Sequence, residues 1–515
     1  MNPKRWLAGI RLGLMLLAGP ASAQAPTASP SPAPPAPSPE PPKLEIALAG
    51  YYEFNGYTQN NFFLGRNASG ISSDHDDYMV NLFRVEPVIR YGPGVKGVMS
   101  IALGQKIFGL DSEVRDIERA GFTNAFNRKD THFFHVDDAY LEFAPPKLRG
   151  FTVRLGRMRN DLGSQLVVDQ DGDGIQIVKS LAADKWRLTL DWTKEWEGAN
   201  SLTDDNFAGG LDGRDANLFY ATLSGKVGKF QIDPFVAFYD DSNSNPYVPG
   251  QLQYFNARFT PNLSRATALG FAWKGALGKA TFKGEGDYLF GKDKIKNASS
   301  GPNQLLDVNN GDLSGHNLYL DIKVPLGRGL LGGTFGLGSG DRDPMSGKGN
   351  INRIRTQGFF YVTEVWEDSI MTDERGITPQ GLGSPASRGY REFENTTLLQ
   401  VSYSLPFGKD KDWTLLGAGT LLRATQPLHP WRDVNGSGAI DPGEFSSESS
   451  KDLGKEMDLR IDWKLLPSLT WTLRGGVMFA GNATGYLVNG TNRFSRNPWE
   501  LRTTVRFNFG GRPVL

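Results

Sequence analysis

Apolar and charged side chains alternate strictly along short segments of this chain, and the clearest of these lie near its C-terminus. Between residues 457 and 464, Leu459, Ile461 and Trp463 alternate with a charged residue at every second position. A strand points successive side chains to opposite faces, so this segment predicts a strand with one apolar and one charged face. Segments of about ten residues with aromatic edges favour a barrel with lipid outside and water inside.

The pattern recurs along most of the chain and predicts an all-β fold. We expect a single transmembrane antiparallel up-and-down β-barrel of about 18 strands. Short connections such as 225–229 and 325–329 alternate with long polar ones such as 240–262 and 340–393. This alternation predicts short periplasmic turns and long extracellular loops. The expected strands start near Ile46, Tyr78, Val95, Val136, Thr152, Ile175, Trp186, Leu218, Phe230, Thr267, Ala280, Leu318, Leu331, Thr396, Trp413, Glu456, Leu469 and Leu501.

The first residues of the chain indicate export. Residues 1–23 combine Lys4 and Arg5 with a short apolar stretch and a final Ala-Ser-Ala, which predicts a signal peptide. Residues 24–43 are rich in Pro, Ala and Ser, so we expect a disordered linker there. The chain has no cysteine, which suits a protein that crosses the periplasm. We therefore expect a barrel over residues 44–515, in the cell outer membrane of a Gram-negative bacterium.

Strand parity predicts which charged residues face the lumen. Cations outnumber anions in the predicted lumen set, although the whole chain is neutral with 56 basic and 56 acidic residues. The surplus is mostly arginine, whose planar guanidinium pairs with carboxylates at two points. This lining therefore predicts a conduit for carboxylated solutes. The expected lumen cations are Arg84, Arg90, Lys106, Arg154, Arg187, Lys283, Lys323, Arg460, Lys464, Arg474, Arg502 and Arg506. The expected lumen anions are Glu86, Asp138, Glu142, Asp191, Glu285, Asp287, Asp321 and Asp462.

Some of these charges can instead pair with one another and brace the barrel. Arg460 with Asp462, and Lys283 with Glu285, are candidates for such pairs. Three other arginines have no obvious acidic neighbour, and we expect these to contact solute. They are Arg154, Arg474 and Arg502. The other lumen arginines that we expect to contribute are Arg84, Arg187 and Arg460.

Five local sequence patterns follow one another along the barrel segment. They are His135-Val-Asp-Asp-Ala-Tyr-Leu-Glu-Phe143, Val153-Arg-Leu-Gly-Arg-Met-Arg159, Gly336-Leu-Gly-Ser-Gly-Asp341, Leu453-Gly-Lys-Glu-Met-Asp-Leu459 and Leu473-Arg-Gly-Gly-Val-Met-Phe479. In order and spacing they resemble the alginate export barrels of the outer membrane. The resemblance implies a barrel of about 18 strands whose arginine-rich constriction passes an anionic polysaccharide outward, with long loops that plug both ends. It also implies solute contact by Arg84, Arg154, Arg157, Arg353, Arg355 and Arg474.

Residues 433–444 match the calcium-binding loop of EF-hands position by position. Carboxylate, amide, hydroxyl and carbonyl oxygens recur there at the spacing that this hard cation prefers, around a turn-making glycine. We therefore expect Ca²⁺ as the one candidate cofactor, in an extracellular loop; the alternative is an acidic surface loop. The expected ligands are Asp433, Asn435, Ser437, Ala439, Asp441 and Glu444.

Other functions stay open at this stage. The barrel can be a general or small-anion-selective porin, or it can sheathe a periplasmic or extracellular partner, with the Pro-rich linker as a docking segment. An enzyme is not expected, because none of the five histidines has a nucleophile partner that parity places nearby. The expected partners are outer-membrane lipid, an anionic polysaccharide or small anions, and periplasmic export proteins; no nucleic acid is expected.

Overall fold

The computed structural model describes most of the chain from residue 43 onward. The described residues are 43–62, 64, 75–92, 94–107, 134–145, 147–196, 216–241, 261–295, 311–340, 362–366, 393, 395–430, 432, 434, 445–493 and 496–510. The predicted signal peptide and almost all of the predicted linker lie outside these residues. Within the described part, no helix is long and apolar enough to cross a membrane.

The described residues form strands and one short helix. The strands are β1 (Leu44–Asn60), β2 (His75–Tyr91), β3 (Val95–Ile107), β4 (Phe134–Phe143), β5 (Phe151–Asp161), β6 (Asp169–Leu181), β7 (Trp186–Trp196), β8 (Ala216–Val227), β9 (Phe230–Asp241), β10 (Pro261–Leu277), β11 (Ala280–Ile295), β12 (Gly311–Leu326), β13 (Gly329–Gly338), β14 (Thr396–Phe407), β15 (Trp413–Leu428), β16 (Ser450–Leu466), β17 (Leu469–Ala480) and β18 (Trp499–Phe509). Helix α3 (Asn482–Asn489) follows β17. Each of the predicted strand starts falls in a different one of these strands.

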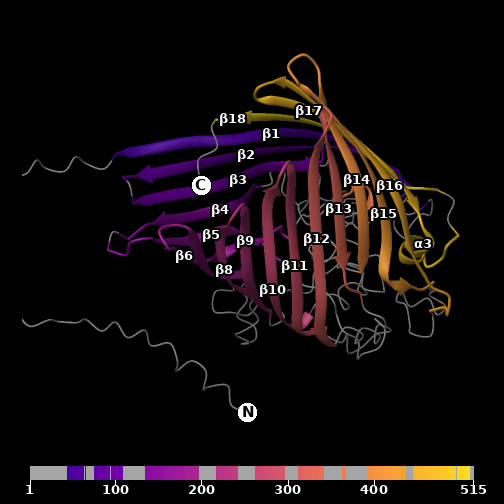
Figure 1. Ribbon diagram of the computed structural model, residues 1–515, viewed down its shortest axis with the longest axis horizontal. Coiled ribbons are helices and arrows are strands. Elements are labelled where there is room, and N and C mark those ends of the chain that lie inside the picture. The colour runs from indigo at the N-terminus through magenta and orange to yellow at the C-terminus, as the bar shows by residue number, and fades with distance from the viewer. Residues whose placement is uncertain are drawn as a thin grey trace, which may run out of the picture. The chain divides into compact units, whose positions relative to one another are not determined.

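The strands form one closed antiparallel barrel. Every strand pairs with its neighbours in the sequence, and the first strand pairs with the last. The closing pair runs from Gly50 opposite Phe509 to Asn60 opposite Trp499, and Figure 1 shows β18 beside β1. The 18-stranded sheet therefore has no free edge, and the predicted all-β up-and-down barrel is confirmed.

The outer face of the barrel is apolar because strand alternation places the large hydrophobic side chains there. Leu459 and Leu501, for example, are 53% and 46% exposed although they lie in the middle of strands. Aromatic rings edge this face, and the rings of Trp413 and Trp463 stack with 4.7 Å between their centroids. An apolar band with aromatic edges is the surface that a bilayer covers. This is the surface of an outer-membrane barrel.

Short turns join the strands at one end of the barrel. The β8–β9 and β10–β11 connections each hold two residues, and Gly228 and Gly278 adopt a left-handed backbone with φ of 61° at each. Glycine suits this conformation because it has no Cβ, and such turns match the twist of the paired strands. The longer connections lie at the opposite end, which is the extracellular end in barrels of this kind.

Candidate functional site

Three arginines lie side by side on the lumen face of adjacent strands. Arg460 of β16 is the register partner of Arg474 of β17, and Arg474 is the partner of Arg502 of β18. Their sequence neighbours Leu459 and Leu501 point to lipid, so alternation turns the arginines inward. We call these three residues the arginine row. Three guanidinium groups on adjacent strands concentrate positive charge on one wall of the lumen.

Two tyrosines continue the arginine row onto the next strands. Tyr57 of β1 is the register partner of Arg502, and Tyr78 of β2 is the partner of Tyr57. The guanidinium carbon of Arg502 lies 4.5 Å from the centre of the Tyr57 ring. The Tyr57 and Tyr78 rings stack 4.6 Å apart. Cation–π contact and ring stacking hold Arg502 against the wall.

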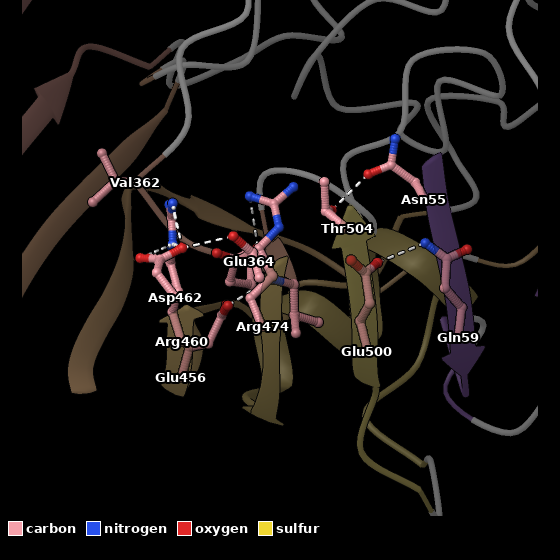
Figure 2. Close-up of polar contacts among 12 residues, drawn as sticks. Asn55, Gln59, Val362, Glu364, Glu456, Arg460, Asp462, Arg474, Glu500 and Thr504 are labelled. Atoms are coloured by element: carbon pink, nitrogen blue, oxygen red, sulfur yellow. Dashed lines mark hydrogen bonds and ion pairs between the residues drawn. The ribbon is translucent and has the colours of Figure 1, made fainter. Parts of the chain in front are cut away.

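Arg460 and Arg474 of the arginine row have carboxylate partners. Arg460 donates from Nε to Asp462 on its own strand over 3.0 Å, so the predicted Arg460–Asp462 pair is confirmed. Arg474 Nη1 lies 3.4 Å from Glu364 Oε2, and both side chains are shielded from solvent on most of their surface. Figure 2 shows both pairs side by side. The row is therefore partly neutralised before any solute enters.

Two further arginines flank the row on neighbouring strands. Arg506 of β18 lies 3.4 Å from Glu53, and its guanidinium carbon lies 3.9 Å from the centre of the Tyr51 ring. Arg84 of β2 pairs with Asp137 and lies 5.7 Å from the same ring. Tyr51 therefore sits between two guanidinium groups. The cationic wall extends from β16 through β18 and β1 to β2.

Residues 362–366, from the connection between β13 and β14, lie inside the barrel against β14, β16 and β17. The backbone N–H groups of Val365 and Trp366 donate to the two carboxylate oxygens of Glu456 over 2.6 and 2.9 Å. Gln400 donates to the carbonyl oxygen of Val362 over 2.8 Å. A loop inside a barrel has no strand ladder for its own backbone, so wall side chains must satisfy these groups. The 362–366 segment is thus fixed at three backbone positions.

Residues 162–168, between β5 and β6, are fixed by the same kind of contact. Ser164 donates its backbone N–H to the carboxylate of Glu285 on β11, far around the barrel from β5 and β6. Glu285 and Asp287 stand two positions apart on β11, as Glu456 and Asp458 do on β16. Each inserted segment is therefore held by the glutamate of a Glu-x-Asp sequence on the wall. The two segments occupy part of the lumen and narrow it.

The two inserted segments also share one apolar cluster with the wall. Val365 and Trp366 have no exposed surface, and Leu166 is almost fully buried. Their neighbours in the cluster include the lumen-facing Leu398 and Met478. Burial of side chains of this size stabilises each by about 1.5–3 kcal/mol relative to exposure. The lumen thus has an apolar side that anchors the segments, besides the cationic wall.

The wall from β5 to β8 carries a different, hydrogen-bonded network. Gln176 donates to the Tyr220 hydroxyl over 2.8 Å, and Tyr220 donates to Asn160 over 3.2 Å. Asn160 in turn donates to Thr193 over 2.8 Å, and Thr193 donates to Asp191 over 2.7 Å. Because every one of these side chains is buried and partnered, the network braces the wall rather than offering free groups to solute.

Arg154 differs from its sequence-based interpretation. It donates from Nε to Glu142 over 2.7 Å and from Nη1 to the side-chain oxygen of Gln176 over 3.1 Å. The prediction that Arg154 and Arg474 lack an acidic neighbour is therefore wrong. Glu142 is the register partner of Arg154 on the adjacent strand, and Glu364 reaches Arg474 from a distant loop. Neither relationship is visible from strand parity alone.

Of the remaining predicted arginines, one lies on the outer face, one faces the lumen and two lie outside the described residues. Arg157 shares the outer face of Leu155, whereas Met158 beside it is buried on the lumen side, so the structure places Arg157 outside the lumen. Arg187 faces the lumen near the turn end of β7, with no ion pair among the described residues. Arg353 and Arg355 lie outside the described residues, as do the six predicted calcium ligands. No cluster of three metal-binding side chains occurs in the part of the chain that the structure describes.

The inserted segments supply the functional residues that sequence reasoning missed. Glu364 and Trp366 lie in a connection where no periodicity exists, so parity assigns them no side. Ser164 contributes its backbone N–H, which any residue would provide. Tyr57 carried a usable signal: it occupies a lumen position of β1 by the same alternation that places the arginines.

A closed barrel with an apolar belt, inserted loop segments and a cationic lumen wall defines the class of porin-like outer-membrane barrels. No protein-family model matches the sequence. No curated protein matches it either. Solved structures show the fold: OccAB3 of Acinetobacter baumannii superposes with a TM-score of 0.51 at 11% identity, covering 91% of this chain and 100% of its own.

Two further solved porins are similar over the same extent. The outer membrane protein opdK from Pseudomonas aeruginosa has a TM-score of 0.48 at 11% identity, covering 91% of this chain and 99% of its own. A BenF-like porin from Pseudomonas fluorescens Pf-5 has a TM-score of 0.48 at 10% identity, covering 91% and 98%. These neighbours are porins of other kinds, so the resemblance to the alginate export barrels stays a prediction.

Proposed function

We propose that this protein is an outer-membrane channel for carboxylate-bearing solutes, which pass along the arginine row. The observation that carries the proposal is the alignment of Arg460, Arg474 and Arg502 in one register line. Guanidinium groups bind carboxylates at two points, and adjacent groups let a carboxylate move from one to the next without losing all its partners. The 362–366 segment contacts the same wall through Glu364 and Arg474, and it narrows the path along the row.

A uronate-bearing polysaccharide is the more specific candidate substrate. Tyr57 and Tyr78 stack beside Arg502, which puts a flat aromatic surface next to a carboxylate-binding group. A uronate unit combines a sugar ring with a carboxylate, and its ring can lie on such a surface while its carboxylate meets the arginine. Small carboxylates would use the arginines alone. The tyrosine pair therefore favours the polymer over the small anion.

The filled lumen argues against a barrel that sheathes a protein partner. The 162–168 and 362–366 segments and their apolar cluster occupy space that such a partner would need. Displacing them would expose buried Val365 and Trp366 to water. A partner would have to replace these contacts in full, at a cost of about 1.5–3 kcal/mol for each such side chain.

Planar-bilayer recording tests the proposal. The purified protein is expected to give a reversal potential of anion-selective sign in a KCl gradient, and polyuronate is expected to block the current more strongly than a neutral glycan of equal length. An Arg474→Gln/Arg502→Gln double variant should lose the selectivity. A Lys229→Gln/Lys279→Gln variant removes the same charge from two short turns and should retain it.

Each outcome has a clear meaning. Cation selectivity of the wild type would contradict the proposed class of solute. Anion selectivity with equal block by monomeric uronate and polyuronate would leave the small-anion porin as the function. Unchanged selectivity in the arginine variant would show that another wall of the lumen sets it.

A further inference from the structure

Two pairs of carboxyl groups lie on the lumen wall, and each pair holds one of the inserted segments. Glu285 and Asp287 stand two positions apart on β11, and Glu456 and Asp458 stand two positions apart on β16. In both pairs the glutamate accepts backbone N–H groups from the segment. We call them the β11 pair and the β16 pair.

All four side chains of these pairs are buried. Glu285 is 0% exposed, Asp287 5%, Glu456 1% and Asp458 9%. Among the described residues, Glu285 Oε1 and both side-chain oxygens of each aspartate have no hydrogen-bond partner. A buried carboxylate oxygen without a donor is unfavourable, because it has lost its contacts with water and gained none in return. Each pair therefore needs a donor that the side chains and backbone around it do not supply.

The aspartate of each pair lies against the glutamate and beside a glycine. The two carboxyl groups of each pair are within hydrogen-bonding reach of each other. Gly270 is the register partner of Asp287, and Gly476 is that of Asp458. A Cβ added to Gly476 would collide with Asp458 Oδ1 and lie 3.3 Å from Glu456 Oε1. The carboxyl oxygens of the β16 pair thus converge on one point, and the glycine offers no side chain that could donate to them.

The surroundings of the β11 pair contain one cation and no other acid at the register positions. Lys283 stands two positions from Glu285 on β11, and its Nζ lies 5.6 Å from the centre of the Tyr319 ring. The 162–168 segment, which packs against Glu285 through Ser164, carries no charged residue. The register partners of the pair on β10 and β12 are uncharged, and one of them is a tyrosine: Gly270, Ala272, Asn317 and Tyr319.

The arginines near the β16 pair are bound to other carboxylates. Arg460 pairs with Asp462, and Arg474 pairs with Glu364. Glu364 belongs to the 362–366 segment and adds a further negative charge beside the pair. The register partners on β15 and β17 are uncharged: Ala418, Thr420, Gly476 and Met478. Two ionised carboxylates at this site would therefore have no cation of their own.

A proton satisfies such a pair better than a metal ion does. Ca²⁺ takes about six to eight oxygen ligands, and no cluster of three metal-binding side chains occurs in the described part of the chain. A proton needs one donor oxygen and one acceptor oxygen, which two adjacent carboxyl groups provide. Two carboxyl groups that share a buried site keep one proton between them, because both cannot be ionised at such a short distance.

We propose that each pair binds one shared proton, and that loss of this proton releases the inserted segment. With the proton in place, the aspartic acid donates its O–H to the glutamate carboxylate, which accepts the N–H groups of the segment on its other side. Loss of the proton to water leaves two negative charges in one buried site. Their repulsion draws water into the site and loosens the segment, so the lumen widens as the pH rises. The inference concerns the inserted segments and is independent of which solute the channel passes.

Single-channel conductance over a pH series tests the proposal. The wild-type conductance should rise from neutral to alkaline pH. The test variants are Asp287→Asn and Asp458→Asn, singly and together, because an asparagine amide donates to the glutamate at every pH, as the protonated acid does at neutral pH. Each single variant should lose part of the rise, and the double variant should lose all of it. At neutral pH the reversal potential should stay unchanged, since a protonated aspartic acid and an asparagine carry the same charge.

Asp321→Asn is the matched control. Asp321 is a lumen aspartate on β12 that lies 3.1 Å from Lys323, and this variant should keep the full response to pH. Infrared difference spectra give a readout besides conductance: the C=O stretching band of a protonated carboxylic acid should be present in the wild type at neutral pH and absent from the double variant. Folding is judged by heat-modifiable gel mobility, and if one of the Asn variants fails to fold, the other pair and the wild-type infrared spectrum still test the proposal.

Three results would overturn the inference. The first is a wild-type protein without the infrared band or without a rise in conductance at alkaline pH. The second is a double variant that keeps the wild-type response to pH. The third is a rise in wild-type conductance when EDTA removes divalent metal at neutral pH, because a metal ion and not a proton would then hold the pairs.

Discussion

Glu364 holds its carboxylate 3.4 Å from Nη1 of Arg474, in the middle of the arginine row. The two residues come from different parts of the fold, a loop segment inside the lumen and the wall strand β17. In the proposed function, Glu364 occupies the position that the carboxylate of a passing solute takes. Such a solute then competes with Glu364 for Arg474.

Replacing Glu364 by Gln should strengthen anion binding. The amide keeps the size of the side chain but removes the charge that competes for Arg474, so block by polyuronate should tighten about two- to five-fold, the range for a partly exposed ion pair. The block constant in planar bilayers measures the effect. Glu448→Gln removes one charge from an exposed position and should leave the block constant unchanged. Equal tightening in both variants would show that the change in net charge, and not the release of Arg474, causes the effect.

Replacing Glu456 by Ala should release the 362–366 segment from the wall. The backbone N–H groups of Val365 and Trp366 lose both of their acceptors, and each buried unpartnered donor costs about 1–3 kcal/mol. Single-channel conductance should rise because the segment no longer narrows the lumen. Glu456→Gln retains one carbonyl acceptor and should give an intermediate conductance. If the Ala and wild-type channels conduct equally, the segment does not limit the flow.

Alternation in the sequence predicts the barrel and the lumen side of the arginine row, because period two fixes the face of every strand residue. Alternation does not predict which residues form ion pairs or hydrogen bonds with one another. Arg154 meets Glu142 only through the register between β4 and β5, which depends on the whole closed sheet. Arg157 was assigned to the lumen by resemblance, whereas its odd spacing from Arg154 puts the two on opposite faces of β5.

The inserted segments could not be predicted for a different reason. Their places depend on single contacts between distant parts of the chain, such as Ser164 with Glu285 and Val365 with Glu456. Only the carboxylates that bind these segments, those of Glu285 and Glu456, could be noticed in the sequence pattern. A glutamate and an aspartate two positions apart on a lumen face need hydrogen-bond partners from elsewhere, and here loop backbones supply them to the glutamates.

Replacing Trp366 by Ala should destabilise the barrel. The side chain is fully buried in the apolar cluster, and truncation of a large aromatic in a packed core costs about 3–5 kcal/mol. Urea unfolding in lipid vesicles, followed by tryptophan fluorescence, measures the loss. Trp499→Ala is the matched control, because its side chain is 36% exposed on the lipid-facing surface and leaves no cavity in the core. A loss no larger than that of the control would show that the cluster does not bear on stability.

Replacing Gly163 by Ala should displace the 162–168 segment from the lumen wall. Gly163 has a left-handed backbone with φ of 57°, and an added Cβ would collide with the carboxylate of Glu285 and lie 3.0 Å from the Ala272 Cβ. Both effects oppose the contact between Ser164 and Glu285, so the variant should conduct more than the wild type. It should keep the anion selectivity that we propose for the distant arginine row. Gly333→Ala adds the same methyl group on β13, where no atom lies within 4 Å, and should conduct normally. A conductance rise in both variants would show that the added methyl group, and not displacement of the 162–168 segment, causes the change. A loss of selectivity in Gly163→Ala would show that this segment does more than narrow the lumen.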